Sequence, residues 1–109
     1  MPHIIYKGLE LNQVKTIEAR VVDALSQIID CPVDHFTTEW TPTTFISRGV
    51  ENQGGYPFVT INWFKRSETM QSEVAEVITD LIKAFGYEDV CVYFNEMSPS
   101  HYYENGTHF

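Results

Sequence analysis

The sequence predicts an α/β protein of the two-layer α+β type, in which two consecutive β-α-β units form a four-stranded mixed sheet with two helices on one face. Two amphipathic helical patterns carry this prediction, because each lies between runs rich in β-branched and aromatic residues. Right-handed connections would bring both helices to the same face of the sheet. The length of 109 residues suits a single domain, residues 1–109.

The first β-α unit begins close to the amino terminus. Residues 3–7 predict a strand, and the helix after it begins either near Glu10 or with Asn12 as its N-cap. This helix must stop near Asp30, because Pro32 disfavours helical geometry at the residue before it. Apolar residues recur every three or four positions along one face of the helix: Leu11, Val14, Ile17, Val21, Leu25 and Ile28.

The β segments that follow are less regular. Residues 36–47 predict a second strand, in which Pro42 should cause a bulge or an unpaired edge. Residues 48–55 are rich in glycine and predict a loop. Residues 58–64 then predict a third strand, whose alternate residues form one almost wholly apolar face.

The second helix has clear ends. Ser67 is a favourable N-cap, and Gly86 is a favourable C-terminal stop. Residues 90–96 predict the fourth strand, and the tail from Pro99 predicts a turn or short hairpin with aromatic anchors. The apolar stripe of this helix consists of Met70, Val74, Val77, Ile78, Leu81, Ile82 and Phe85.

Charge and composition argue against several classes of function. The formal net charge of −8 repels nucleic acid and anionic membranes, so neither is an expected partner. No signal peptide or membrane-spanning stretch is recognisable in the sequence, and we expect a cytoplasmic protein. Cys31 and Cys91 match no metal-binding or redox spacing, so we expect free thiols and no metal site.

Pro2 is the first candidate for chemistry. Aminopeptidases remove an initiator methionine when the next residue is small, which would leave the secondary amine of Pro2 as the chain terminus. A free amine at the start of a strand can act as a base if its surroundings keep it unprotonated. The alternative is that Pro2 only begins an edge strand, where its missing N–H has no cost.

Three features occur together in this chain: the opening Met1–Ile4, the Cys31–Pro32 turn before the second strand, and the doubled β-α-β order. In this combination the chain resembles the tautomerase superfamily, which includes 4-oxalocrotonate tautomerase and macrophage migration inhibitory factor (MIF). A ferredoxin-like sandwich has the same order of elements and is the alternative fold. Further segments are similar to a branch of small uncharacterised tautomerase-like proteins: Phe36–Thr37, Tyr56–Pro57, Trp63–Phe64 and residues 102–109.

The resemblance implies a tautomerase or related isomerase in which Pro2, after removal of Met1, is the general base acting on a small keto or enol acid. It also implies a homotrimer that needs no metal and no organic cofactor. The alternative is a non-catalytic tautomerase-like oligomer that binds a metabolite or a partner chain. While Met1 remains attached, the nitrogen of Pro2 is a tertiary amide and cannot be a base.

Topology indicates which residues surround Pro2. The start of a parallel second strand brings His35 towards it, and the end of an antiparallel third strand brings Trp63, Lys65 and Arg66. Lys65 and Arg66 are the first candidates to hold a substrate carboxylate, the alternative being a solvated basic pair. His35 could polarise a carbonyl group. Trp63 is expected in the core or at a subunit interface first, and at the pocket wall second.

The resemblance adds two residues to the candidates. Other tautomerases carry an arginine in the loop after the second strand, so Arg48 is an alternative ligand for the carboxylate. Tyr103 lies in the tail, which should hold to the sheet or to a neighbouring subunit and could complete its pocket. The cytokine-like branch has a lysine where this chain has Cys31, so a supporting positive charge must come from elsewhere.

Overall fold

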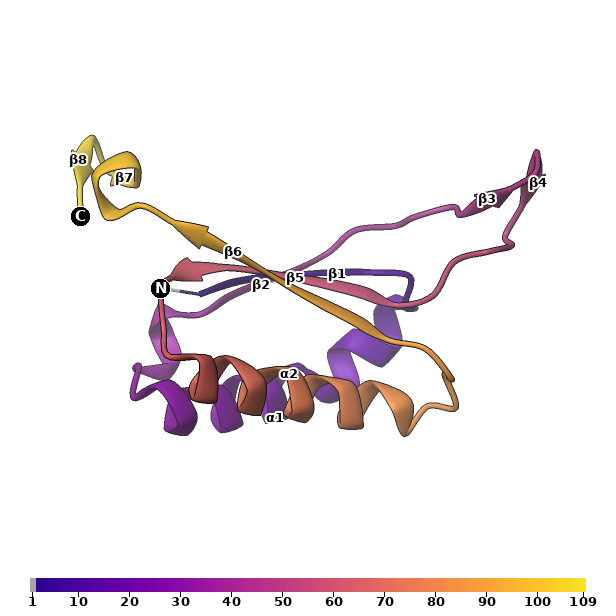
Figure 1. Ribbon diagram of the computed structural model, residues 1–109, viewed down its shortest axis with the longest axis horizontal. Coiled ribbons are helices and arrows are strands. Elements are labelled where there is room, and N and C mark those ends of the chain that lie inside the picture. Colours follow the sequence, from indigo (N-terminus) through magenta and orange to yellow (C-terminus); the bar gives the residue numbers. More distant parts are fainter. Residues whose placement is uncertain (1) are drawn as a thin grey trace.

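The computed structural model describes residues 2–109, and this part of the chain folds as two layers (Figure 1). Within it, two α-helices cover one face of a four-stranded sheet with the strand order β2-β1-β5-β6. The predicted fold class is therefore confirmed. The elements of the two layers are β1 (His3–Lys7), α1 (Leu11–Ile29), β2 (Thr37–Trp40), β5 (Phe58–Phe64), α2 (Glu68–Lys83) and β6 (Cys91–Met97).

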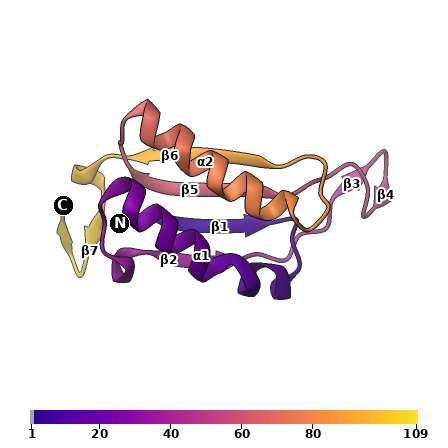
Figure 2. The same ribbon diagram turned by 90° about the horizontal axis from the view of Figure 1, so that it is seen from below.

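The register determines what lies beside the start of β1. This strand is parallel to β2 and antiparallel to β5, and β5 is parallel to β6, as two β-α-β units require. His3 lies opposite Thr37 on one side and opposite Asn62 on the other. The start of β1 is thus flanked by the start of β2 and by the end of β5 (Figure 2).

Local signals set the ends of both helices. The N-cap of α1 is Glu10 and not Asn12, because Glu10 and Gln13 form a reciprocal capping box at that position. The helix ends at Asp30, which adopts the left-handed conformation with φ of 51°. At the start of α2, the hydroxyl of Ser67 accepts a hydrogen bond from the backbone N–H of Met70 at 3.2 Å, as predicted.

The core lies between the helices and one face of the sheet. Tyr6 of β1 and Trp63 of β5 are its largest fully buried side chains. Each fully buried large apolar side chain contributes about 1.5–3 kcal/mol to stability. Within residues 2–109, neither the Tyr6 hydroxyl nor the Trp63 indole N–H has a hydrogen-bond partner. Burial, with the nearby carboxylate of Glu18, raises the pKa of Tyr6, so its phenol is neutral.

Between β2 and β5 the chain differs from the prediction. Only the first part of residues 36–47 is paired as β2, because Pro42 has no N–H to continue the ladder. The predicted loop at 48–55 contains the turn of a short hairpin instead. Arg48 (φ 50°) and Gly49 (φ 83°) both have the left-handed conformation that a tight two-residue hairpin turn requires. The strands of this hairpin are β3 (Ile46–Ser47) and β4 (Val50–Glu51).

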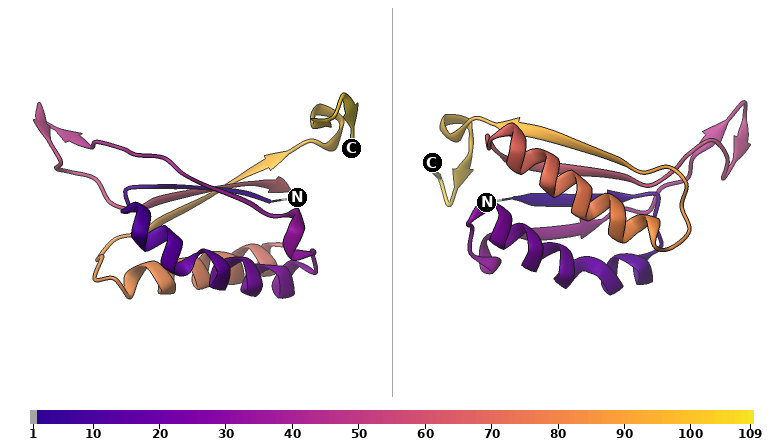
Figure 3. Two further views of the ribbon diagram at one scale, coloured as in Figure 1. Left: turned by 180° about the vertical axis from the view of Figure 1, so that it is seen from behind. Right: turned by 60° about the horizontal axis from the view of Figure 1, so that its bottom comes forward.

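The predicted hairpin in the tail is confirmed. Its turn consists of Asn105 (φ 54°) and Gly106 (φ 83°), the residue pair that favours this turn most strongly. Figure 3 shows the hairpin at the end of the sheet where the amino terminus lies. Its strands are β7 (Tyr103–Glu104) and β8 (Thr107–His108), and short 3-10 helices at Val33–His35 and Pro99–His101 precede β2 and this hairpin.

No helix in the described part of the chain combines the length and the apolar character needed to cross a membrane.

Candidate functional site

Pro2 lies at the start of β1, between the two segments that the sequence indicated. Its carbonyl oxygen accepts a hydrogen bond of 3.1 Å from the backbone N–H of Thr37, at the start of β2. On the other side, the antiparallel register that pairs His3 with Asn62 brings the end of β5 alongside. The side chain of Pro2 is fully buried. The start of β1 is therefore a packed position and not a loose terminus.

A cavity of about 320 Å³ opens beside the start of β2. Thr37 lines it from β2, and the C-terminal hairpin adds residues from the other end of the chain. Pro2 is not among its lining residues, although Thr37 connects the two. Among the described residues that line it, two are carboxylates and none is a lysine or arginine, so the cavity does not favour an anion. The lining residues are Asp34, His35, Thr37, Glu104 and Phe109.

An aromatic cluster holds the C-terminal hairpin over this end of the sheet. The rings of Phe64, Tyr102 and Phe109 form a mutual triangle with centroid distances of 5.4, 5.6 and 5.0 Å. The backbone N–H of Phe109 also donates to the carbonyl oxygen of Tyr102 at 3.0 Å. Tyr103 is 62% exposed, contacts the ring of His108 edge-to-face at 5.5 Å, and does not line the cavity. The tail is thus anchored to the end of β5.

The predicted basic pair lies at the end of β5, and its two members differ. Lys65 is exposed to solvent. Arg66 donates from Nη1 to the carbonyl oxygen of Phe64 at 2.9 Å, and its guanidinium lies 5.8 Å from the centre of the Trp63 ring. Trp63 itself is fully buried and packs on Phe94 at 4.7 Å. Trp63 is therefore a core residue, and it does not line the cavity.

Arg48 is far from the other candidates within one chain. It forms the turn of the β3–β4 hairpin, which projects from the end of the sheet opposite to the amino terminus (Figure 1). The fold of a single chain therefore does not bring Arg48 to Pro2. A larger hollow of about 610 Å³ also lies at that far end, next to Phe45 and Tyr87, and none of the predicted site residues lines it.

His35 and Cys31 form a loose pair beside the cavity. The Cys31 sulfur lies 3.9 Å from Nδ1 of His35, and Cys31 is buried at the end of α1. Its carbonyl oxygen accepts a hydrogen bond of 2.6 Å from the hydroxyl of Ser26. His35 lines the cavity. Within residues 2–109, no group of three His, Cys, Asp or Glu side chains could hold a metal ion.

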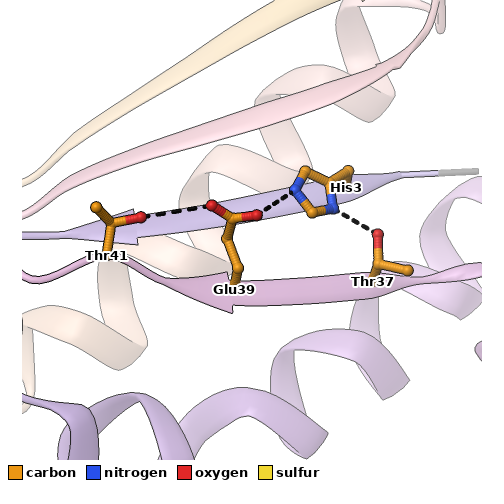
Figure 4. A network of polar contacts seen from close by, with 4 residues as sticks. All are labelled: His3, Thr37, Glu39 and Thr41. Carbon is orange, nitrogen blue, oxygen red and sulfur yellow. Dashed lines mark hydrogen bonds and ion pairs between the residues drawn. The ribbon is translucent and has the colours of Figure 1, made fainter.

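The sheet face that the helices leave uncovered carries a network of polar contacts (Figure 4). His3 contacts Oγ1 of Thr37 through Nδ1 at 2.6 Å and Oε2 of Glu39 through Nε2 at 2.9 Å. Thr41 donates to the other oxygen of Glu39 at 3.4 Å. His3 and Thr37 were not expected at the site from the sequence, although alternation along β2 puts Thr37 and Glu39 on one face. The register between β1 and β2 then places His3 beside these two side chains.

The sequence pattern of one protein family, described as Domain of unknown function (DUF1904), matches residues 1–108. The chain belongs to this family. A DUF1904 protein from Sebaldella termitidis ATCC 33386 has a crystal structure that aligns over 100% of both chains, with 36% sequence identity and a TM-score of 0.94. A search of curated proteins finds no match to the sequence.

Two structures of lower identity share the fold of this DUF1904 chain. One is a MIF-like protein from Entamoeba histolytica, 18% identical, with a TM-score of 0.75 over 99% of this chain and 98% of that chain. The other is a fused 4-OT described as an asymmetric trimer, 11% identical, with a TM-score of 0.81 over 97% and 94%. The predicted resemblance to the tautomerase superfamily is confirmed, since the DUF1904 domain has the fold of its MIF and 4-OT members.

Replacing Tyr102 by alanine should loosen the C-terminal hairpin, because it removes two ring contacts of about 0.5–1.5 kcal/mol each. We expect amide hydrogen exchange at Phe109 to accelerate at least about fivefold. Tyr103→Ala is the matched control: its exposed ring contacts His108, so it should leave the Phe109 amide unchanged. Equal acceleration in both variants would contradict the anchoring role of Tyr102.

Proposed function

We propose that this DUF1904 protein is a cofactor-independent tautomerase or related isomerase, with Pro2 as the general base acting on a small keto or enol acid. The observation that carries the proposal is the position of Pro2. It directly precedes the central strand β1 of a tautomerase-superfamily fold and is joined through Thr37 to a cavity large enough for a small molecule. The cavity volume of about 320 Å³ lies within the range of small-ligand sites.

The chemistry requires a neutral amine. An ordinary α-amino group has a pKa of about 8, and a secondary amine is more basic, so the surroundings must lower the value. Burial disfavours the charged form of an amine, and the side chain of Pro2 is fully buried. The amine exists only after removal of Met1, which lies outside the described residues. General base catalysis of this kind contributes about 10²–10⁴-fold to a rate.

The carboxylate of the substrate would bind at the end of β5, not inside the cavity. Asp34 and Glu104 make the cavity unfavourable for an anion. Lys65 is the better ligand of the basic pair, because it is exposed while the guanidinium of Arg66 already donates to Phe64. The reacting carbonyl would then point towards His35 and the cavity.

A homotrimer is part of this proposal. The uncovered face of the sheet presents large side chains to solvent, including Phe58 and Tyr93, which is 56% exposed. The fused 4-OT with the same fold is described as a trimer. In such an assembly Arg48 of the β3–β4 hairpin, or Tyr103 of the C-terminal hairpin, would contribute to the site of a neighbouring subunit.

The second candidate function is a non-catalytic oligomer that binds a metabolite or a partner chain. Two observations favour it: Pro2 does not line the cavity, and the cavity wall contains no lysine or arginine among the described residues. In this case the cavity would bind a ligand without turnover.

The state of the amino terminus tests the base. We expect protein that begins at Pro2 to ketonise the enol of phenylpyruvate at least about 100-fold faster than protein that retains Met1, because only the former has a basic nitrogen. Pro2→Ala is not a suitable test, since it leaves a primary amine. Intact mass verifies both termini. Equal rates for the two proteins would exclude Pro2 as the base.

Removal of the Lys65 charge tests the carboxylate site. Lys65→Gln should raise KM for phenylpyruvate about five- to tenfold with little change in kcat, because the charge binds the ground state and the transition state alike. Lys83→Gln removes the same charge from the end of α2 and should have no effect. An unchanged KM in the Lys65 variant would place the carboxylate elsewhere.

Light scattering tests the trimer. The mass in solution should be three times the 12.6 kDa of one chain. Tyr93→Asp, on the uncovered face, should reduce it to that of a single chain, because burying an unpaired carboxylate in an interface is costly. Tyr56→Asp changes an exposed tyrosine outside the sheet and serves as the control. A single-chain mass for the unmodified protein would refute the assembly.

A further inference from the structure

Thr37 is the residue through which the network on the uncovered face reaches the cavity. Its backbone N–H donates to the carbonyl oxygen of Pro2 at 3.1 Å. Its hydroxyl oxygen lies 2.6 Å from Nδ1 of His3, and the residue lines the cavity of about 320 Å³. Thr37 therefore contacts the imidazole of His3 through its hydroxyl (Figure 4) and also belongs to the wall of the cavity.

Glu39 determines how the imidazole can be protonated. A carboxylate only accepts hydrogen bonds, so Nε2 of His3 must carry the hydrogen of the 2.9 Å contact to Glu39. In the neutral ring, Nδ1 then has no hydrogen and accepts from the hydroxyl of Thr37. The oxygen of Thr37 is left with lone pairs for the cavity, where it can accept a hydrogen bond from an enol O–H group.

Adding one proton to His3 reverses the direction of the second contact. Both ring nitrogens of an imidazolium are donors, so Nδ1 donates to the oxygen of Thr37. The hydroxyl hydrogen of Thr37 is then free to point into the cavity and to donate to a ketone oxygen. Glu39 accepts the hydrogen of Nε2 in both states of the ring. With neutral His3 the network can therefore accept a hydrogen bond from the enol, and with protonated His3 it can donate one to the ketone.

We propose that Thr37 is a catalytic residue of this site and that His3 and Glu39 are its positioning residues, together forming a proton relay to the substrate oxygen. This rests on the proposed tautomerase function. It assigns the proton transfer at the substrate oxygen to Thr37, while Pro2 transfers the proton at the substrate carbon. The group that enters the cavity is then the neutral carbonyl or enol of the substrate, which agrees with the carboxylates of Asp34 and Glu104 in its wall.

In the direction of enolisation, the neutral amine of Pro2 takes a proton from the substrate carbon as a C=C bond forms and C=O becomes C–O. The substrate oxygen receives the hydroxyl proton of Thr37, whose oxygen in the same step takes the proton from Nδ1 of a protonated His3. Pro2 is left protonated and His3 neutral, and proton exchange with water restores both groups. Ketonisation follows the same steps in reverse. No oxidant, metal or covalent intermediate takes part.

The hydroxyl of Thr37 is tested by a series of single substitutions in protein that begins at Pro2. Thr37→Val keeps the shape and removes the hydroxyl, and it should lower kcat/KM for the phenylpyruvate enol about 10- to 100-fold. Thr37→Ser keeps the hydroxyl and should stay within about threefold of the unmodified protein. Thr44→Val removes an exposed hydroxyl between β2 and β3, outside both the network and the cavity lining, and should have no effect.

Glu39→Gln separates positioning from binding. An amide can either accept from Nε2 or donate to it, so it no longer fixes which nitrogen of His3 carries the hydrogen, and kcat should fall about tenfold with KM nearly unchanged. A purely structural role of Thr37 predicts instead that Thr37→Ser is impaired like Thr37→Val. That result, or a Thr37→Val protein as active as the unmodified one, would overturn the relay.

A second measurement does not depend on turnover. The ring nitrogens of His3, observed by ¹⁵N NMR, should shift when phenylpyruvate is added to the unmodified protein or to Thr37→Ser, and should not shift in Thr37→Val. A His3 ring that ignores the ligand in the unmodified protein would overturn the proposal. Failure of the relay and failure of the base are distinguishable, because the ¹⁵N shift of His3 needs no turnover and can also be measured in protein that retains Met1, in which Pro2 cannot be a base.

Discussion

The pairing of β1 with both of its neighbours is the constraint on which the rest of the site depends. A shift of one residue would turn Ile4 and Tyr6 out of the core and His3 into it, so the burial of these side chains sets the register. The same register joins Pro2 to Thr37 and brings His3 between Thr37 and Glu39. The packing of one face of a short central strand thus decides the polar contacts on its other face.

The site draws on both ends of the chain. Phe109 and Glu104 line the cavity together with Thr37 because the rings of Phe64 and Tyr102 hold the C-terminal hairpin in place. Charge is divided between two places, with carboxylates in the cavity and basic side chains at the end of β5. This division would orient a substrate that carries both groups, because its carboxylate favours the basic end of β5 and its neutral carbonyl favours the cavity.

Much of the fold could be predicted from local patterns. The helical stripes, the cap at Ser67 and the apolar alternation of β5 each lie within a few residues and do not require knowledge of distant contacts. The prediction was less accurate between β2 and β5, where the turn at Arg48 and Gly49 lacks the residue pair usual in such hairpins. The aromatic residues of the tail indicated an anchor, but not that Tyr102 would form it while Tyr103 faces solvent.

The sequence by itself determined the two β-α-β units, the residues of the core and the position of Pro2 at the start of a strand, because periodicity and capping act over short distances. Only the tertiary structure decided that Arg48 lies at the opposite end and that His3 meets Thr37 and Glu39. These outcomes depend on strand register and on the docking of the tail. Both are set by contacts between residues far apart in the chain, for which no local pattern exists.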